Sequence, residues 1–371
     1  MTVAVVIAGG GTGGHLYPGI AVARELLARR PDARVTFAGT AAGIEARVIP
    51  REGFELDVIR STGLKGKSAM ARLRGAALLP LSAWDAWTVL SRRRPSVVVG
   101  VGGYSSGPIV GLAALRRVPT LLMEQNAMPG LANRSLARVV DAAAVTYEAS
   151  RAFFGSKAFL SGNPVRAEFF DDSPVIGGMG GHDDDGWAPP GAARVLVFGG
   201  SQGAHAINVA MVEAAARLGD AAARLAITHQ TGERDLEMVR DGYRRAGIAA
   251  RVEPFLYAMA SEMKRADLVI CRAGATTLAE LTAAGRASIL VPLPTATDDH
   301  QRKNALALVT GGAARMIEQR DLTADRLAST IITLAGDVDE RQRLATAARA
   351  MARPDAARVI VDRILQLAGA A

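Results

Sequence analysis

The chain opens on an apolar stretch that runs directly into a glycine turn and then into a helical pattern. Residues 3–8 are apolar and rich in β-branched side chains, residues 9–14 are Gly-Gly-Gly-Thr-Gly-Gly, and a helical pattern with His15 and Pro18 at its start follows. A strand, a glycine turn and a helix start in this order bring backbone N–H groups and the positive end of a helix to an anion. The sequence therefore predicts an α/β fold whose first turn binds a phosphate or diphosphate through the main chain.

Two common nucleotide-binding motifs fit this turn poorly. Residues 9–14 agree with the dinucleotide spacing G-x-G-x-x-G, but the second strand, near residues 34–39, ends at Thr40 without the acidic residue that holds a ribose. A Walker loop is excluded because Ser61 stands where that loop requires glycine. No nicotinamide, flavin or other cofactor is expected.

Composition limits the class of protein. With 371 residues, of which 49% are hydrophobic, the chain is long enough for two domains with sizeable cores. A single cysteine, Cys271, excludes an internal disulfide framework and fits a reducing compartment. No zinc-type Cys/His cluster, no signal-peptide pattern and no apolar run of about 20 residues is present, so we expect no metal site, no secretion and no membrane span.

The net charge of +8 indicates an anionic partner. Basic residues concentrate in residues 60–94, which also contain several leucines, Trp84 and Trp87. Such a segment is typical of a surface that lies on an anionic bilayer, but an amphipathic helix with both tryptophans in the core has the same pattern. The pattern alone leaves both interpretations open. The basic residues are Arg60, Lys65, Lys67, Arg72, Arg74, Arg92, Arg93 and Arg94.

Strand-like and helical patterns alternate in two series. The first series of strands is near residues 3–8, 35–38, 97–101, 120–123, 142–145 and 157–160, and the second is near 195–198, 223–230, 252–253, 268–271, 288–291 and 314–317. Near-continuous apolar strands predict parallel sheets covered by helices on both faces. We expect two tandem, doubly wound, Rossmann-like domains facing a cleft.

A Gly-, Pro- and Asp-rich linker, residues 171–194, separates the two series. The first domain is predicted over residues 1–165 and the second over residues 166–353. A last helix within residues 354–371 is expected to rejoin the first domain, because its apolar residues recur at helical spacing.

Candidate site residues lie beyond the predicted carboxyl ends of the strands, where open α/β folds bind ligands. His15 follows the first glycine turn at a helix start, where the helix field favours the neutral imidazole of a general base. Arg166 is placed to clamp a diphosphate or to pair with a nearby acid such as Glu168. The spacing Thr277-x-x-Glu280 alone favours a capping box with Thr277 as the N-cap.

Seven motifs follow one another along nearly the whole chain: GGGTGGHLYP, GVGGYSSGP, EQN, GNPVR, GGSQGA, CRAGATTLAE and DDHQRKNA. In this order and spacing they resemble the MurG family of bacterial peptidoglycan N-acetylglucosaminyltransferases. The resemblance implies a GT-B fold and inverting transfer of GlcNAc from UDP-GlcNAc to the 4-hydroxyl of MurNAc in undecaprenyl-diphosphate-MurNAc-pentapeptide (lipid I to lipid II). It also implies a metal-free active site, a peripheral location on the cytoplasmic membrane face and contacts with other cell-wall synthesis proteins.

The resemblance also implies roles for individual residues. Arg166 and Ser201 lie near the diphosphate, the backbone of Leu256 meets the uracil, and Glu280 binds the ribose hydroxyls. His15 is the expected base, with Glu124 as the alternative. The full set of implied donor contacts is Thr12, Gly13, Gly14, Asn126, Arg166, Ser201, Leu256, Ala275, Thr276, Thr277, Leu278, Ala279, Glu280, His300 and Gln301.

Two other functions compete with this interpretation. A UDP-GlcNAc 2-epimerase would use the same fold without a lipid acceptor. A non-catalytic scaffold would use the basic surface to bind nucleic acid or a membrane, but it leaves the glycine turns unexplained. We expect no nucleic-acid partner, because the basic loops lack base-stacking aromatic residues.

Overall fold

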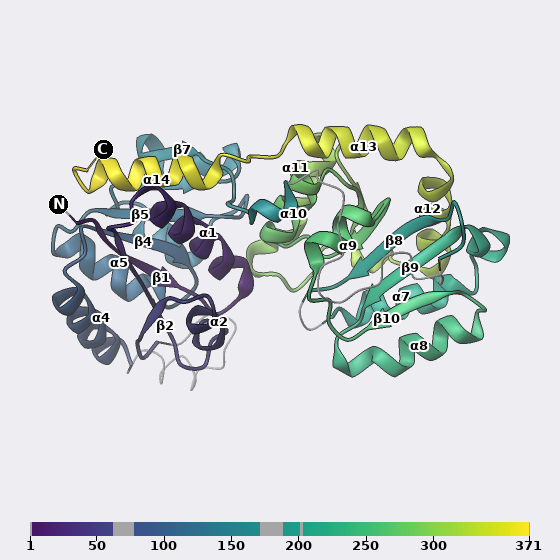
Figure 1. Ribbon diagram of the computed structural model, residues 1–371, viewed down its shortest axis with the longest axis horizontal. Coiled ribbons are helices and arrows are strands. Elements are labelled where there is room, and N and C mark those ends of the chain that lie inside the picture. The colour runs from purple at the N-terminus through teal and green to yellow at the C-terminus, as the bar shows by residue number, and fades with distance from the viewer. Residues whose placement is uncertain (1, 62–77, 171–187, 201–202, 371) are drawn as a thin grey trace. The chain divides into compact units, whose positions relative to one another are not determined.

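The computed structural model describes residues 2–61, 78–170, 188–200 and 203–370, which form two compact units (Figure 1). Unit 1 comprises Met1–Val165 and Arg353–Ala371, and unit 2 comprises Arg166–Ala352. Each unit contains one parallel sheet flanked by helices, which confirms the predicted fold class. Most of the predicted linker, including the aspartates at 183–185, lies outside the described residues.

The sheet of unit 1 has seven strands in the order β3-β2-β1-β4-β5-β6-β7, all paired in parallel. The order reverses between β1 and β4, so the loops that follow these two strands lie at the topological switch point, where open sheets bind ligands. Its strands are β1 (Ala4–Gly9), β2 (Arg34–Gly39), β3 (Glu55–Val58), β4 (Val97–Gly102), β5 (Thr120–Glu124), β6 (Ala142–Val145) and β7 (Ala158–Leu160).

Helices cover both faces of this sheet because alternate residues of each strand point to opposite sides. Val5 and Ile7 of β1 pack with α1 (Gly13–Arg29) and α14 (Ala356–Leu367), whereas Val6 and Ala8 pack with α4 (Leu79–Arg93) and α5 (Ser106–Leu115). The last helix therefore belongs to unit 1, where it lies beside α1 (Figure 1). The remaining helices of this unit are α2 (Glu45–Arg51) and α6 (Leu131–Leu136).

Unit 2 repeats this plan with six strands in the order β10-β9-β8-β11-β12-β13. Its order reverses between β8 and β11, so Gly199 and Gly200, which follow β8, and the loop before α10 lie at its switch point. Its strands are β8 (Ala193–Phe198), β9 (Leu225–Gln230), β10 (Ala250–Glu253), β11 (Leu268–Cys271), β12 (Ala287–Leu290) and β13 (Arg315–Met316). Its helices are α7 (His205–Ala215), α8 (Leu236–Arg245), α9 (Met259–Arg265), α10 (Ala275–Ala284), α11 (His300–Thr310), α12 (Ala324–Gly336) and α13 (Val338–Ala350).

The interpretation of residues 60–94 as a helix with both tryptophans in the core is wrong. Trp84 and Trp87 are 67% and 50% exposed. The helix α4 instead buries a face made of small and aliphatic residues, among them Ala86, Val89 and Leu90. Four of the eight basic residues lie outside the described residues. Within the part of the chain that is described, no helix has the length and hydropathy needed to cross a bilayer.

Candidate active site

The first turn of α1 presents His15 in a defined tautomer. Thr12 is the N-cap of α1 and Gly13 its first residue, so His15 lies in the first turn. His15 Nδ1 is 3.1 Å from Gln125 Oε1, and Gln125 Nε2 donates to the carbonyl of Val101 at 3.1 Å. Because the amide nitrogen of Gln125 is used on Val101, its oxygen accepts the proton of His15 Nδ1. Nε2 of a neutral His15 is then the basic nitrogen, as a general base requires.

Glu124, the alternative base, binds groups of the loop that follows β5. It is buried and accepts hydrogen bonds from the N–H groups of Asn126 (2.9 Å) and Gly130 (3.1 Å). The side-chain amides of Asn126 (3.2 Å) and Asn133 (2.9 Å) also donate to it. Both carboxylate oxygens are thus engaged in organising the loop after β5. This geometry favours His15 over Glu124 as the base.

The first glycine turn holds an anion that the sequence analysis missed. The N–H of Gly11, one of the donors predicted to bind phosphate, donates to Glu45 Oε2 at 2.9 Å. Glu45 begins α2 and is buried. A side chain of the protein itself therefore takes part of the turn's hydrogen-bonding capacity.

In unit 2, the start of α10 differs from the predicted capping box. Its N-cap is Gly274, and Thr277 lies three residues inside the first turn, so the prediction of Thr277 as N-cap is wrong. Glycine has no side chain with which to cap a helix, and the residues that follow supply main-chain N–H groups at the positive end of α10. Such a helix start is suited to bind a diphosphate.

Glu280 and Arg166 approach each other beside this helix. Glu280 Oε1 is 4.0 Å from Arg166 Nη2, while Arg166 Nη1 pairs with Glu168 Oε1 at 2.9 Å. Burial raises the pKa of Glu280 to about 7, and Arg166 partly opposes this rise while Glu168 adds to it. A carboxylate that is costly to ionise gains from hydroxyl donors such as those of a ribose.

Gln230 joins two loops at the carboxyl edge of the unit 2 sheet. Its Oε1 accepts the N–H of Leu256 at 2.8 Å, and its Nε2 donates to the carbonyl of Gly200 at 2.8 Å. Leu256, predicted to meet a uracil through its backbone, has its N–H already committed to Gln230. Its carbonyl is the main-chain group left for such a contact.

His300 and Gln301 lie at the start of α11. His300 Nδ1 donates to the carbonyl of Thr297 at 2.7 Å, and Gln301 Oε1 accepts the N–H of Leu293 at 3.0 Å. Both side chains thus fix the loop between β12 and α11. In the described residues, no group of three His, Cys, Asp or Glu side chains is arranged as a metal site.

The other predicted donor contacts that the structure describes fall at two places. Gly13 and Gly14 lie in the first turn of α1, next to the exposed Thr12. Ala275 and Leu278 are buried, which leaves their backbone for a ligand, whereas the remaining residues of that stretch are partly exposed: Thr276, Thr277 and Ala279. Ser201 lies outside the described residues.

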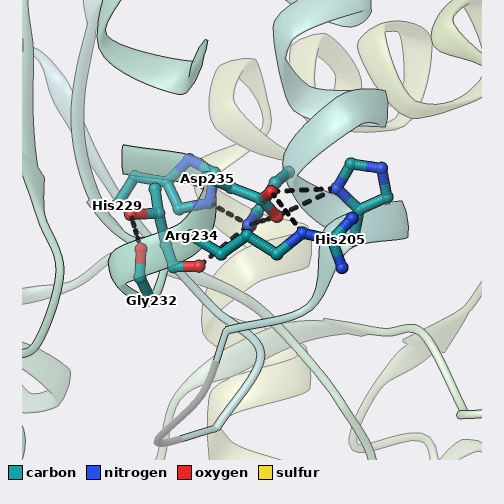
Figure 2. Close-up of polar contacts among 7 residues, drawn as sticks. His205, His229, Gly232, Arg234 and Asp235 are labelled. Atoms are coloured by element: carbon teal, nitrogen blue, oxygen red, sulfur yellow. Dashed lines mark hydrogen bonds and ion pairs between the residues drawn. The ribbon is translucent and has the colours of Figure 1, made fainter. Parts of the chain in front are cut away.

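A polar network at the start of α7 was not predicted from the sequence (Figure 2). His205 Nδ1 is 3.0 Å from Asp235 Oδ2, and Asn208 donates to the same oxygen at 2.8 Å. Asn208 Oδ1 accepts from Nε2 of His229 at 3.0 Å, and burial lowers the pKa of His229 to about 3, so this ring is neutral. The signal in the sequence is a repeat, because His205 follows the glycine-rich motif GGSQGA as His15 follows the glycine turn at residues 9–14.

Models of two protein families match most of the chain. The model of the glycosyltransferase family 28 N-terminal domain matches residues 5–145, and that of the glycosyltransferase family 28 C-terminal domain matches residues 194–360. Each match lies largely within one of the two units.

Two curated relatives and one solved structure agree with these family matches. A protein of Pelobacter propionicus named UDP-N-acetylglucosamine--N-acetylmuramyl-(pentapeptide) pyrophosphoryl-undecaprenol N-acetylglucosamine transferase is 50% identical over 97% of this chain and 98% of its own length. A protein of Myxococcus xanthus with the same name is 46% identical over 98% and 92%. The crystal structure of Acinetobacter baumannii MurG is 30% identical, with a TM-score of 0.78 over 98% of this chain and 99% of that one. The chain therefore belongs to glycosyltransferase family 28 and, within it, to the MurG family of N-acetylglucosaminyltransferases.

Proposed function

We propose that this chain transfers GlcNAc from UDP-GlcNAc to the 4-hydroxyl of MurNAc in undecaprenyl-diphosphate-MurNAc-pentapeptide, with inversion at the sugar. The observation that carries this function is the similarity over nearly the full length to relatives named as this transferase. The chain uses a UDP-sugar donor and a lipid-linked acceptor.

The acceptor is activated from unit 1. The Nε2 atom of His15 takes the proton of the acceptor hydroxyl as that oxygen attacks the anomeric carbon. Gln125 supports this step, because its oxygen holds the other proton of the ring on Nδ1. The donor is α-linked to UDP, so one in-line displacement gives a β-linked product, and the bond to the leaving phosphate oxygen breaks as the new bond forms.

The leaving UDP is stabilised from unit 2. Its developing negative charge is placed at the start of α10 and near the guanidinium of Arg166. Donors that are already oriented in this way lower a barrier by several kcal/mol, because they need not reorganise during the reaction. Glu280 accepts from the ribose, the carbonyl of Leu256 accepts from the uracil, and Gln301 with His300 lies beside the sugar. Thr12, Gly13, Gly14 and Asn126 of unit 1 are further donor contacts that the family resemblance implies.

The exposed apolar and aromatic side chains of α4, which we call the α4 surface, dock on the anionic cytoplasmic face of the membrane, where the lipid acceptor resides. This α4 surface consists of Leu79, Leu81, Trp84 and Trp87, which are all at least 41% exposed. The guanidinium of Arg116 lies 4.5 Å from the centre of the Trp87 ring. Exposed apolar and aromatic side chains flanked by arginine are typical of interfacial membrane binding. Contacts with other cell-wall synthesis proteins would form at the same membrane.

Transfer of radiolabelled GlcNAc to a short-chain analogue of the lipid acceptor, measured with EDTA present, tests this function. We expect radiolabelled GlcNAc to appear in the acceptor at the same rate with and without EDTA. When the acceptor is left out, no labelled transfer product should form. Conversion of UDP-GlcNAc to another UDP-sugar in the absence of acceptor would instead indicate an epimerase. Retention of label in UDP-GlcNAc under all conditions would contradict both activities.

A further inference from the structure

A buried carboxylate occupies the first glycine turn, residues 9–14, which we also call the first glycine loop. The residue Glu45 is 1% exposed, and its carboxylate accepts three hydrogen bonds. The N–H of Gly11 donates to Oε2 at 2.9 Å, and the N–H and Oγ of Thr40 both donate to Oε1 at 2.9 Å. Two of these donors are main-chain N–H groups at the ends of β1 and β2, the kind of donor that glycine turns offer to phosphate.

The loops are shaped around this carboxylate. A Cβ atom added to Gly10, Gly39 or Gly43 would lie 2.4, 2.6 or 2.1 Å from an atom of the Glu45 side chain. These distances are shorter than any van der Waals contact, so the loops after β1 and β2 both depend on glycine to close over Glu45. A phosphate group therefore has no room at this position while Glu45 occupies it.

The same loop touches the surroundings of His15. A Cβ atom on Gly103 would lie 2.4 Å from the carbonyl oxygen of Gly10, and one on Gly102 would lie 2.9 Å from His15 Nδ1. Gly10 is thus held between Glu45 on one side and the loop after β4 on the other. Gly10 and Gly11 directly precede Thr12, the N-cap of α1, so a shift of either residue would move the start of the helix that carries His15.

We propose that Glu45 is a built-in anion that replaces phosphate in the first glycine loop and acts as a positioning residue for His15. Under this inference, unit 1 binds no nucleotide diphosphate at Gly11, and the nucleotide of the donor is bound by unit 2. The inference rests on the proposed function, because it takes His15 as the base. Glu45 does not touch the reacting atoms. It keeps the loop in the one conformation that directs the imidazole to the acceptor.

Removal of the carboxylate, followed by its replacement with a small anion, tests this role. We expect Glu45→Ala to lower kcat by about 100-fold, because a displacement of about 1 Å in a catalytic group costs this much. The dissociation constant for UDP should stay within about two-fold of the wild-type value, since its site is in unit 2. Saturating formate should restore kcat in part and raise the Tm of Glu45→Ala, but not that of the wild-type protein. Glu52→Ala serves as the matched control and should have the kcat of the wild type, because Glu52 is the C-cap of α2 and its side chain, 27% exposed, pairs with Arg24 and not with the glycine turn.

Several results would overturn the inference. These are a folded Glu45→Ala protein with wild-type kcat, a loss of UDP affinity in parallel with kcat, and a loss of kcat that formate does not restore. If Glu45→Ala does not fold, Glu45→Gln provides the test. This variant keeps the volume of the side chain but places an amide NH₂ group against the hydrogen-bond donors of Gly11 or Thr40. A lower kcat with unchanged UDP affinity then supports the role, and a wild-type kcat overturns it. A wild-type protein without transferase activity refutes the proposed function instead, and the effect of formate on Tm still tests Glu45.

Discussion

At the residue scale, one hydrogen bond decides which nitrogen of His15 is available for chemistry. Because Gln125 Oε1 accepts from Nδ1, the lone pair lies on Nε2. The sequence does not reveal this hydrogen bond, because His15 and Gln125 are 110 positions apart. The sequence does place His15 after a glycine turn and Gln125 after a strand, and the order of the strands then brings both to one edge of the sheet.

His15→Ala should lower kcat for sugar transfer by about 10²–10⁴-fold, the usual contribution of a general base. The affinity for UDP-GlcNAc should change by less than about three-fold, because the substitution removes a group that acts on the acceptor. Single-turnover rates and calorimetric binding of UDP-GlcNAc measure the two effects separately. Gln125→Leu is expected to give a smaller loss of kcat, since the ring remains but its tautomer is no longer fixed. A His15→Ala enzyme with wild-type kcat from pH 6 to 9 would rule out the base.

The affinity for UDP-GlcNAc should depend on pH through Glu280. Its pKa of about 7 means that the carboxyl is mostly protonated at pH 6 and mostly ionised at pH 8. Because ribose hydroxyls donate better to a carboxylate, the affinity should rise roughly ten-fold over this interval, in line with the change in ionised fraction. UDP-GlcNAc is the right probe, since its diphosphate diester does not titrate here. Glu280→Gln should bind UDP-GlcNAc more weakly than the wild type, and its affinity should not change between pH 6 and pH 8. A variant that keeps the pH dependence of the wild-type affinity would contradict the assignment.

At the element scale, the apolar periodicity of the sequence predicted most strands but not their functional surroundings. The strand β3 was missed because its sequence Glu-Leu-Asp-Val alternates charged and apolar residues at the edge of the sheet. Its buried Asp57 pairs with Arg92 and Arg93 of α4, at 2.5 and 2.8 Å. The face of α4 that packs inward carries Ala86, Val89 and Leu90, which leaves Trp84 and Trp87 exposed. A pattern of residues along one helix cannot reveal such a choice.

Membrane binding should depend on the α4 surface. Trp84→Glu and Trp87→Glu should each weaken binding to vesicles that contain phosphatidylglycerol by about ten-fold or more, since an indole contributes much of the apolar area of such a surface. Higher salt should weaken wild-type binding as well, because screening reduces the attraction between arginines and anionic lipid. Val338→Glu, at a position of unit 2 that is 64% exposed, is the matched control. Equal binding of Trp84→Glu and the control would contradict the assignment.

The last helix should contribute to the stability of unit 1. Ile364 of α14 is fully buried against the core that contains Val5 and Leu16. Ile364→Ala should lower the free energy of unfolding by about 2–5 kcal/mol, the usual cost of deleting a buried aliphatic side chain. Ile332→Ala, at a position that is 39% exposed, should cost much less. Urea unfolding followed by circular dichroism measures both, and equal effects would show that α14 packs loosely.

At the scale of the whole molecule, the two-unit plan followed from repetition in the sequence. Two series of apolar strands predicted two parallel sheets, and a last helix was predicted within residues 354–371, where α14 is found. What the sequence did not reveal are contacts across long separations. Glu45 in the first glycine loop and Asp235 beside His205 are both joined to residues about 30 positions away. Such pairings depend on the strand order, which local patterns do not encode.

The most direct measurement of the central claim is the anomeric configuration of the product. A short-chain lipid acceptor and UDP-GlcNAc are incubated with the protein in the presence of EDTA, and the new glycosidic bond is examined by proton NMR. One displacement assisted by His15 predicts a β-linkage to the 4-hydroxyl of MurNAc and one UDP released for each bond formed. An α-linkage, or release of UDP without a new bond, would contradict the mechanism.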